Sequence, residues 1–192
     1  MILARKKFLK RQCRLLAKNL IFVDETGFHP GRTPVRGWSK KGQRLYGYEQ
    51  YYSKGMRLTI IGAISIKSIV AKMTARGGVG LNIFKNFVAK HLSPILKPGH
   101  IVVWDNLNTH KNQEIVRMIK AKGARVLFTP PYSPEFNPIE LAWSKLKHLI
   151  RKMKTRTIRD LQQAIYKAFR KISISDLKGW FKHAGYKVSQ LQ

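Results

Sequence analysis

Three short apolar runs, each followed by polar residues or proline, constrain the fold of this chain most strongly. The runs are LIFVDET (20–26), HIVVWD (100–105) and ARVLFT (124–129). Their length and their β-branched and aromatic content predict buried strands, and helical patterns follow the second and the third run. Because strands alternate here with helices, the sequence predicts an α/β sheet with parallel neighbouring strands and helices on both faces.

The remaining elements are predicted from the same periodicities. RLTIIGAISI (57–66) and SIVAKMT (68–74) predict a pair of strands, and a further strand is expected from near Gln43 to Tyr48. The stretch 29–44, rich in glycine, proline and cations, predicts a long loop. Helices are predicted over 4–18, 82–96 and 112–122, from a cap at Asn137 to Ile150, from Thr157 with Asp160 three residues later, and from Ser175 to Gly185.

The length and composition of the chain predict a single core. The chain has 192 residues, of which 44% are apolar. We expect a basic helical segment at 1–19, one main domain at 20–186 and a short tail at 187–192. No apolar run is long enough to cross a membrane, and no secretory signal is predicted. Cys13 is the only cysteine, which excludes an internal disulfide framework and a multi-cysteine metal site.

The charge balance indicates a polyanionic partner. The chain has 38 Lys+Arg against 9 Asp+Glu, a formal net charge of +29, and such a charge is typical of proteins that bind nucleic acid. An abundant basic scaffold protein is the alternative, whereas an acidic disordered region is excluded by the apolar content. Because carboxylates are so few, those that end strands are candidates for a function.

Two of these carboxylates, Asp24 and Asp105, stand at the carboxyl ends of predicted strands. Ligand sites in open α/β sheets form at such ends, and two carboxylates on adjacent strands would repel each other. A divalent cation relieves the repulsion, and Mg²⁺ or Mn²⁺ prefers oxygen ligands. With a third carboxylate, such a site can hold two metal ions and promote displacement at a phosphodiester.

Glu140 is the candidate for this third carboxylate. It follows Asp105 after 34 intervening residues and lies about 100° from Ile139 on a helical wheel, at the edge of the apolar stripe. The same position is the third of the helix capped by Asn137, where a capping-box carboxylate is usual. From spacing alone, a metal ligand and a helix cap both remain open.

Three segments of the chain resemble the signature blocks of a known family. FVDETGF (22–28), VVWDNLNTH (102–110) and PPYSPEFNPIELAWSKLK (130–147) resemble the three blocks of DDE transposases, closest to the mariner superfamily in its bacterial insertion sequence 630 branch. RGWSKKGQR (36–44) resembles the basic tryptophan–glycine loop that follows the first block. The resemblance covers residues 20–186.

The resemblance implies a fold, an activity and partners. It implies a ribonuclease-H-like fold with a mixed central sheet of about five strands and helices on both faces. It implies an enzyme that uses two Mg²⁺ or Mn²⁺ ions to cleave DNA at transposon ends and join the freed 3′-hydroxyl to target DNA. Asp24, Asp105 and Glu140 map onto the catalytic, metal-binding carboxylates of the family, and residues 20–186 onto its catalytic domain.

Relatives act as dimers on paired DNA ends and usually carry helix-turn-helix units before the catalytic domain. We therefore expect a homodimer in the bacterial cytoplasm, associated with the nucleoid, and a separately encoded helix-turn-helix protein or a truncated copy. Two other functions remain open: a ribonuclease-H-like nuclease without strand transfer, and a catalytically inactive basic DNA-binding protein.

Further residues are candidates for DNA contacts and auxiliary roles. An exposed Trp38 could stack on a splayed base, although a satellite apolar contact is the alternative. Asn106 and His110 could orient phosphate or water, or could form a turn and a helix cap. Glu25 should face the other side of the sheet, and Trp143 is expected in the core. The predicted DNA contacts are Arg36, Trp38, Lys40, Lys41, Arg44, Lys145 and Lys147.

Overall fold

A five-stranded mixed sheet forms the centre of the molecule. The computed structural model describes residues 2–32, 37–46, 57–106 and 112–188. The strand order is β3-β2-β1-β4-β5; β1–β2 and β2–β3 are antiparallel, whereas β1–β4 and β4–β5 are parallel. The strands are β1 (Leu20–Phe28), β2 (Leu58–Ile64), β3 (Ile69–Arg76), β4 (Ile101–Trp104) and β5 (Arg125–Phe128). The predicted mixed sheet of about five strands is confirmed.

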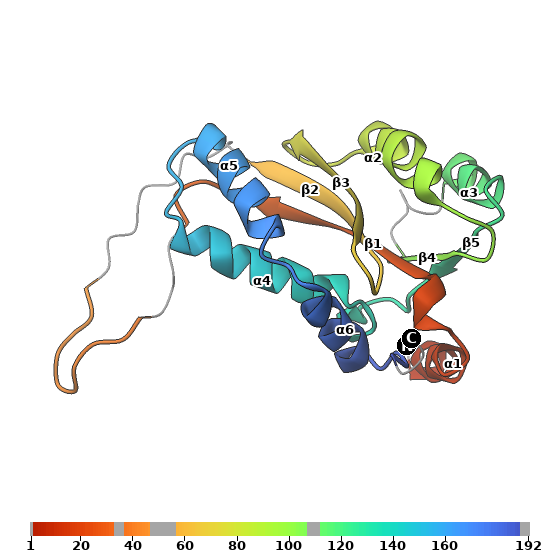
Figure 1. Cartoon of the computed structure of the whole chain (residues 1–192), viewed down its shortest axis with the longest axis horizontal. Helices are drawn as coiled ribbons and strands as arrows, with labels where there is room; N and C mark the ends of the chain where they lie inside the picture. Colours follow the sequence, from red (N-terminus) through yellow and green to blue (C-terminus); the bar gives the residue numbers. More distant parts are fainter. Residues whose placement is uncertain (1, 33–36, 47–56, 107–111, 189–192) are drawn as a thin grey trace.

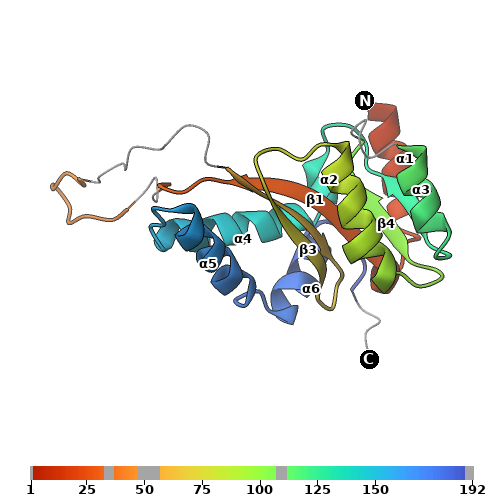
Figure 2. The same cartoon turned by 90° about the horizontal axis from the view of Figure 1, so that it is seen from above.

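Helices cover both faces of the sheet, as predicted (Figure 1). Alternate residues of the strands point to opposite faces, so the sheet separates two apolar cores. The first core packs the sheet against α1, α4, α5 and α6, and the second packs it against α2 and α3 (Figure 2). The helices are α1 (Ile2–Gln12), α2 (Leu81–Phe87), α3 (Gln113–Lys120), α4 (Ile139–Lys152), α5 (Ile158–Phe169) and α6 (Ile174–His183).

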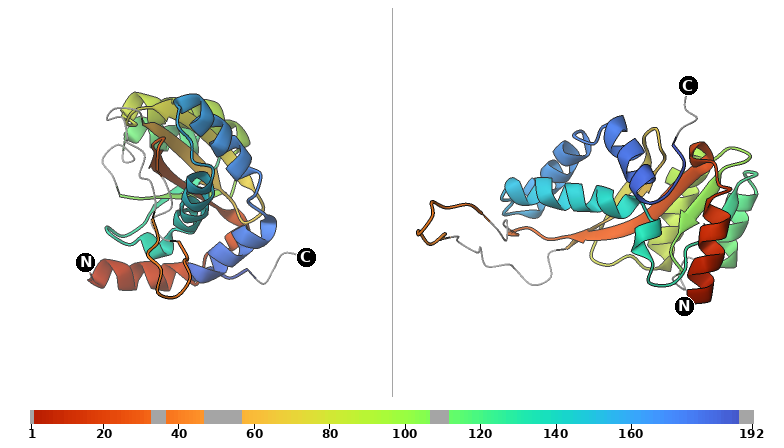
Figure 3. Two further views of the ribbon diagram at one scale, coloured as in Figure 1. Left: turned by 90° about the vertical axis from the view of Figure 1, so that its left-hand side faces the viewer. Right: turned by 90° about the horizontal axis from the view of Figure 1, so that it is seen from below.

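The N-terminal helix packs into the first core. Phe8 of α1 is buried there, and the Gln12 side-chain amide donates to the carbonyl of Ala184, just after α6. Figure 3 shows α1 running beside the C-terminal part of the chain. The basic segment 1–19 therefore shares a core with the main domain.

Two predicted helices are shorter than their sequence patterns suggested. The helix expected over 4–18 ends at Gln12, because the chain turns there to bury Ala17 and Leu20 on the sheet. The helix expected over 82–96 is regular only to Phe87. A π-helical turn and a 3₁₀ turn follow, and Pro94 in the 3₁₀ turn has no N–H for a continuing helix.

Three helix starts can be compared with their predicted caps. Thr157 and Asp160 form the expected capping box. The last helix begins earlier than predicted, because Ser173 rather than Ser175 caps it and pairs with Asp176. The predicted side-chain cap by Asn137 is wrong: α4 starts at Ile139 without a side-chain cap.

The predicted strand near Gln43 to Tyr48 is not found in its described part. Residues 43–46 form no strand, and residues 47 and 48 lie outside the described residues. Trp38, earlier in the same loop, is fully exposed. No helix within the described ranges is long and apolar enough to span a bilayer, and Cys13 is free and exposed.

Candidate active site

Asp24 lies in the middle of β1, which continues to Phe28, whereas Asp105 directly follows the parallel strand β4. The prediction that Asp24 ends its strand is therefore wrong. Phe22 of β1 pairs with Val103 of β4, and each aspartate follows its paired residue by two positions. Because side chains two apart in a strand share a face, Asp24 points, like Phe22, toward the core that contains α4. The register therefore places the two aspartates at the same level of neighbouring strands, although only Asp105 stands at a strand end.

Glu140 joins these two aspartates at one pocket. The pocket has a volume of about 350 Å³ and opens between the middle of β1, the end of β4, the loop after β5 and the start of α4. All three acids line it, together with Asn106 and a proline-rich loop. The full lining is Asp24, Asp105, Asn106, Thr129, Pro130, Pro131, Tyr132, Ser133, Pro134, Asn137 and Glu140.

The backbone around Asn137 explains why Glu140 faces the pocket rather than forming a capping box. The Asn137 N–H donates to the carbonyl of Pro134 at 2.9 Å, so it is not available to the Glu140 carboxylate. The Asn137 side chain is buried, and its Oδ1 has no hydrogen-bond partner among the described residues. An unsatisfied amide oxygen at the wall of an acidic pocket could accept a hydrogen bond from a bound water.

The loop that precedes Glu140 packs against α1 and against the C-terminal segment. Phe8 packs against Phe136 with ring centroids 4.9 Å apart, and Arg5 forms an ion pair with Glu135. The Tyr186 hydroxyl donates to the carbonyl of Phe136 at 2.9 Å. These contacts fix the start of α4 relative to the sheet.

Trp143 connects α4 directly to Asp24. Its indole Nε1–H donates to Asp24 Oδ2 at 2.9 Å, while the ring is buried against β2. Gly62, which pairs with Asp24 across the sheet, leaves the space for this ring: a Cβ at that position would lie 2.6 Å from Trp143 Cη2. Trp143 is thus in the core, as predicted, and also orients Asp24, which was missed. The one sequence signal for this contact was a glycine, Gly62, within the apolar strand β2.

The carboxylates in the pocket repel one another. Burial, and then the nearby Glu140 carboxylate, raise the pKa of Asp24 from 3.8 to about 7, and Asp105 adds to the rise. The backbone N–H of Glu25 and the Trp143 indole oppose it only in part. A cation placed among the three carboxylates would remove this repulsion.

The three carboxylates suit a hard divalent cation, but in this structure they do not lie close enough together to coordinate one. All three side chains offer carboxylate oxygens, which Mg²⁺ and Mn²⁺ prefer. Among the described residues, however, no three His, Cys, Asp or Glu side chains lie close enough together to hold a metal ion. Binding would therefore require Asp24, Asp105 and Glu140 to approach one another across the pocket that they share.

The other predicted site residues fall into different environments. Asn106 lines the pocket, whereas His110 and Arg36 lie outside the described residues. Glu25 pairs with Ile61 and follows Val23 on the opposite face, as expected. The predicted DNA contacts Trp38, Lys40, Lys41 and Arg44 are all exposed.

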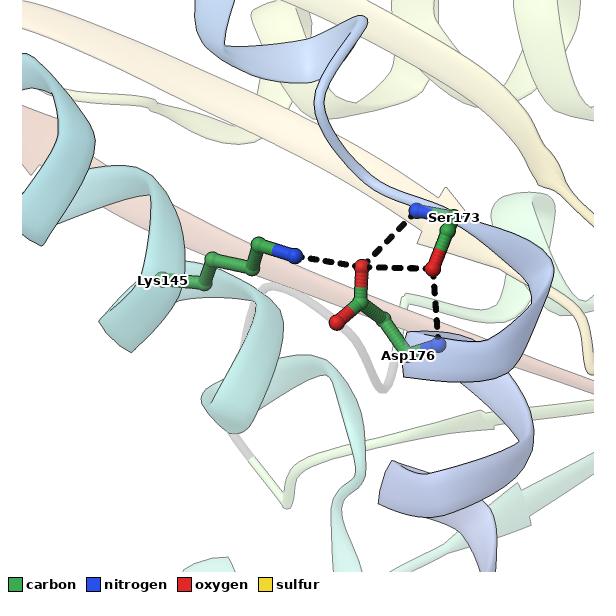
Figure 4. A network of polar contacts seen from close by, with 3 residues as sticks. All are labelled: Lys145, Ser173 and Asp176. Atoms are coloured by element: carbon green, nitrogen blue, oxygen red, sulfur yellow. Dashed lines mark hydrogen bonds and ion pairs between the residues drawn. The ribbon is translucent and has the colours of Figure 1, made fainter.

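Lys145 and Lys147 differ in what surrounds them. The Lys145 ammonium forms an ion pair with Asp176, which also accepts hydrogen bonds from Ser173 at the start of α6 (Figure 4). Lys145 therefore joins α4 to α6 in this structure. Lys147 is half-buried and lines a second pocket.

Replacing Trp143 by phenylalanine should weaken metal binding while preserving the fold. Phenylalanine removes the N–H that holds Asp24 and also the indole ring atoms that lie beside Gly62. We expect Mn²⁺ affinity to fall about 10- to 100-fold, the usual effect of losing a partner of a metal ligand, and the melting temperature to fall because a buried side chain loses volume. Titration calorimetry with Mn²⁺ and melting in EDTA measure the two quantities. Trp180→Phe, in the same core, is the control; equal affinities in both variants would contradict the role of the N–H.

The sheet, the pocket and its acids can now be compared with known proteins. The family described as the DDE superfamily endonuclease matches residues 19–163. The chain therefore belongs to the DDE superfamily endonucleases. No curated protein sequence matches the chain.

Solved structures give a narrower likeness, to Mos1 transposase. The pre-cleavage Mos1 transpososome is similar with a TM-score of 0.77 at 12% identity, covering 94% of this chain and 57% of that chain. The Mos1 mariner paired-end complex with Mn gives 0.74 at 12% identity, covering 94% and 57%. The Mos1 catalytic domain gives 0.64 at 11% identity, covering 94% and 85%. The expected ribonuclease-H-like fold is confirmed, and the chain spans little more than half of the transposase in those complexes.

Proposed function

We propose that this chain is the catalytic domain of a mariner-superfamily transposase, of the bacterial insertion sequence 630 branch. It would cleave DNA at transposon ends and join the freed 3′-hydroxyl to target DNA. The observation that carries the proposal is the convergence of Asp24, Asp105 and Glu140 on one pocket beside the middle of β1 and the carboxyl end of β4. Family membership supports the same assignment.

In this proposal Asp24, Asp105 and Glu140 hold two Mg²⁺ or Mn²⁺ ions. Such ions, when bound, activate the attacking oxygen and stabilise the leaving oxygen of a phosphodiester displacement. Trp143 holds one oxygen of Asp24, which leaves the other to turn into the pocket. Because the pKa of Asp24 is near neutrality, this carboxyl releases its proton as positive charge enters. Asn106, on the pocket wall, can orient a phosphate or water.

The proposed partners follow from charge and from the structural relatives. A chain with a net charge of +29 attracts DNA over a broad surface, while only the acidic pocket performs chemistry. The similar Mos1 structures are described as a paired-end complex and a strand transfer complex. By analogy we propose a homodimer on paired ends, assisted by a separate helix-turn-helix protein, in the bacterial nucleoid.

Joining of DNA strands is the test of this function. Pre-cut DNA with a free 3′-hydroxyl, mixed with target DNA and Mn²⁺, should yield joined products, because one pocket can use water or a 3′-hydroxyl as nucleophile. Lengthened strands on a denaturing gel measure the reaction. Glu140→Gln should abolish joining, whereas Glu114→Gln, on α3 and paired with Lys85, should retain it. Cleavage without joining would instead indicate a nuclease. The absence of both cleavage and joining would indicate a basic DNA-binding protein.

A further inference from the structure

A second, smaller pocket lies where the end of β1 meets the last turns of α4. Its volume is about 20 Å³, and none of the described residues that line it is acidic. Cations from two distant parts of the chain meet there. The lining residues are Gly27, Phe28, His29, Arg32, Lys147, Ile150 and Arg151.

Three positive charges share this pocket, and no carboxylate lines it in the part of the chain that the structure describes. Lys147 and Arg151 are half-buried, and Arg32 is exposed at the rim. Within the described ranges, none of the three forms an ion pair with an acidic side chain, in contrast to Lys145 two residues before Lys147. Like charges held together are repulsive unless an anion lies between them, so the pocket favours an anionic ligand.

The size and the donor types of the pocket indicate which anion fits. A space of about 20 Å³ accommodates one group of the size of a water molecule, and therefore a phosphate oxygen but not a nucleobase. Arginine presents N–H groups in a fork that matches phosphate geometry, and lysine adds a point charge. Phe28 and Ile150 form the buried floor and limit how deeply a ligand can enter.

The second pocket is aligned with the acidic pocket along the same two elements. β1 carries Asp24 to the first and Gly27 to the second. On α4, Lys147 and Arg151 follow Glu140 by seven and eleven residues, within about 20° of the same line along the helix. At 1.5 Å per residue they stand about 10 and 16 Å beyond Glu140. A DNA strand advances about 3.4 Å per phosphate along its axis, so this offset corresponds to about three to five nucleotides.

We propose that Arg32, Lys147 and Arg151 form a phosphate-binding subsite for DNA, about three to five nucleotides from the phosphate held by the acidic pocket. This inference rests on the proposed function, since the acidic pocket sets the position of the reacting phosphate. The subsite fixes the register of the strand along β1 and α4, and it carries no sequence information because it contacts the backbone alone.

The salt dependence of DNA binding tests the subsite without any metal. Lys147→Gln/Arg151→Gln removes two charges but keeps much of each side-chain stem. Arg117→Gln/Lys120→Gln removes the same charge from exposed positions on α3, across the sheet. With a labelled DNA duplex in EDTA, the first variant should lose about tenfold in affinity, and the slope of log K against log salt should fall by about one, as expected for one lost phosphate contact. Equal slopes in the two variants would overturn the subsite.

A length series of single strands tests the distance between the two pockets. With Ca²⁺ present, the affinity of the unsubstituted protein should step upward once the strand reaches about five nucleotides, long enough to span both sites. Lys147→Gln/Arg151→Gln should show no step, and the α3 variant should keep it. A gradual rise in the unsubstituted protein would refute the predicted offset.

The results separate the subsite from the proposed function. A reduced salt slope in EDTA together with absence of cleavage and joining would support the subsite and remove the transposase assignment. Joining by the unsubstituted protein, with equal slopes in the two double variants, would support the assignment and remove the subsite.

Discussion

Replacing Asp105 by asparagine is expected to lower metal-dependent DNA cleavage at least 100-fold, to roughly the level of a metal-free reaction, while DNA binding stays within about twofold. Loss of an indirect partner of a metal ligand costs about 10- to 100-fold, and a direct ligand should cost more. Asparagine keeps the size of Asp105 but removes its charge beside Asp24. DNA binding depends on the cationic surface, so removing one negative charge should not weaken it.

The cleavage of supercoiled plasmid with Mn²⁺ and the binding of labelled duplex in EDTA measure these two properties. Glu114→Gln is the matched control, because Glu114 lies on α3, pairs with Lys85 and does not line the pocket. Cleavage by Asp105→Asn at the rate of the unsubstituted protein would remove Asp105 from the active site. Equal loss in both variants would indicate a general effect of charge.

Replacing Asp24 by asparagine is expected to stabilise the metal-free protein at neutral pH. The pKa of Asp24 is raised from 3.8 to about 7, mainly by burial and then by Glu140. Between these two values the folded chain binds more protons than the unfolded chain, so stability falls as pH rises through this window. At about 1.4 kcal/mol per pKa unit, the loss above pH 7 is of the order of 4 kcal/mol. Asparagine avoids this loss because it does not ionise.

Melting in EDTA as a function of pH measures this effect. Near pH 4 the two proteins should melt alike, and near pH 8 Asp24→Asn should melt several degrees higher, since about 1 kcal/mol corresponds to 2–4 °C in a domain of this size. Mn²⁺ should raise the melting temperature of the unsubstituted protein only. Asp160→Asn is a control for which the opposite change in melting temperature is expected near pH 8. The Thr157 hydrogen bonds lower the pKa of Asp160, so its ionised form stabilises the folded chain. A melting temperature of Asp24→Asn below that of the unsubstituted protein at pH 8 would contradict the prediction.

Local patterns predicted most of the secondary structure because its causes are local. The apolar runs of β1, β4 and β5 and the capping box of Thr157 and Asp160 depend on residues within a few positions of each other. The errors occurred where other parts of the structure compete with the local pattern, in the turn before α4 and at the entry to the sheet. The Asn137 N–H bonds to Pro134 in the turn before α4, and α1 ends where the chain must enter the sheet.

The prediction of the candidate site was partial for the same reason. Asp24, Asp105 and Glu140 were singled out from strand ends, spacing and resemblance, and the structure places all three on one pocket. The contact between Trp143 and Asp24 joins residues 119 positions apart, and only a glycine at position 62 hinted at it. Lys145 and Lys147 were predicted as equivalent DNA contacts, yet one pairs with Asp176 and the other lines the cationic pocket.

The amino-acid sequence by itself determined the sheet-forming runs, the excess of positive charge and the three acids available for a metal. Periodicity, composition and turn chemistry are properties of neighbouring residues, and they persist in any arrangement of the elements. Only the tertiary structure decided that Trp143 orients Asp24, that Glu140 escapes a capping box, and that Arg32 meets Lys147 and Arg151 in one pocket. The first and the last of these features arise from the packing of α4 along β1, which brings together side chains more than one hundred residues apart in the sequence. The second follows from the turn before α4, where the Asn137 N–H is bonded to Pro134.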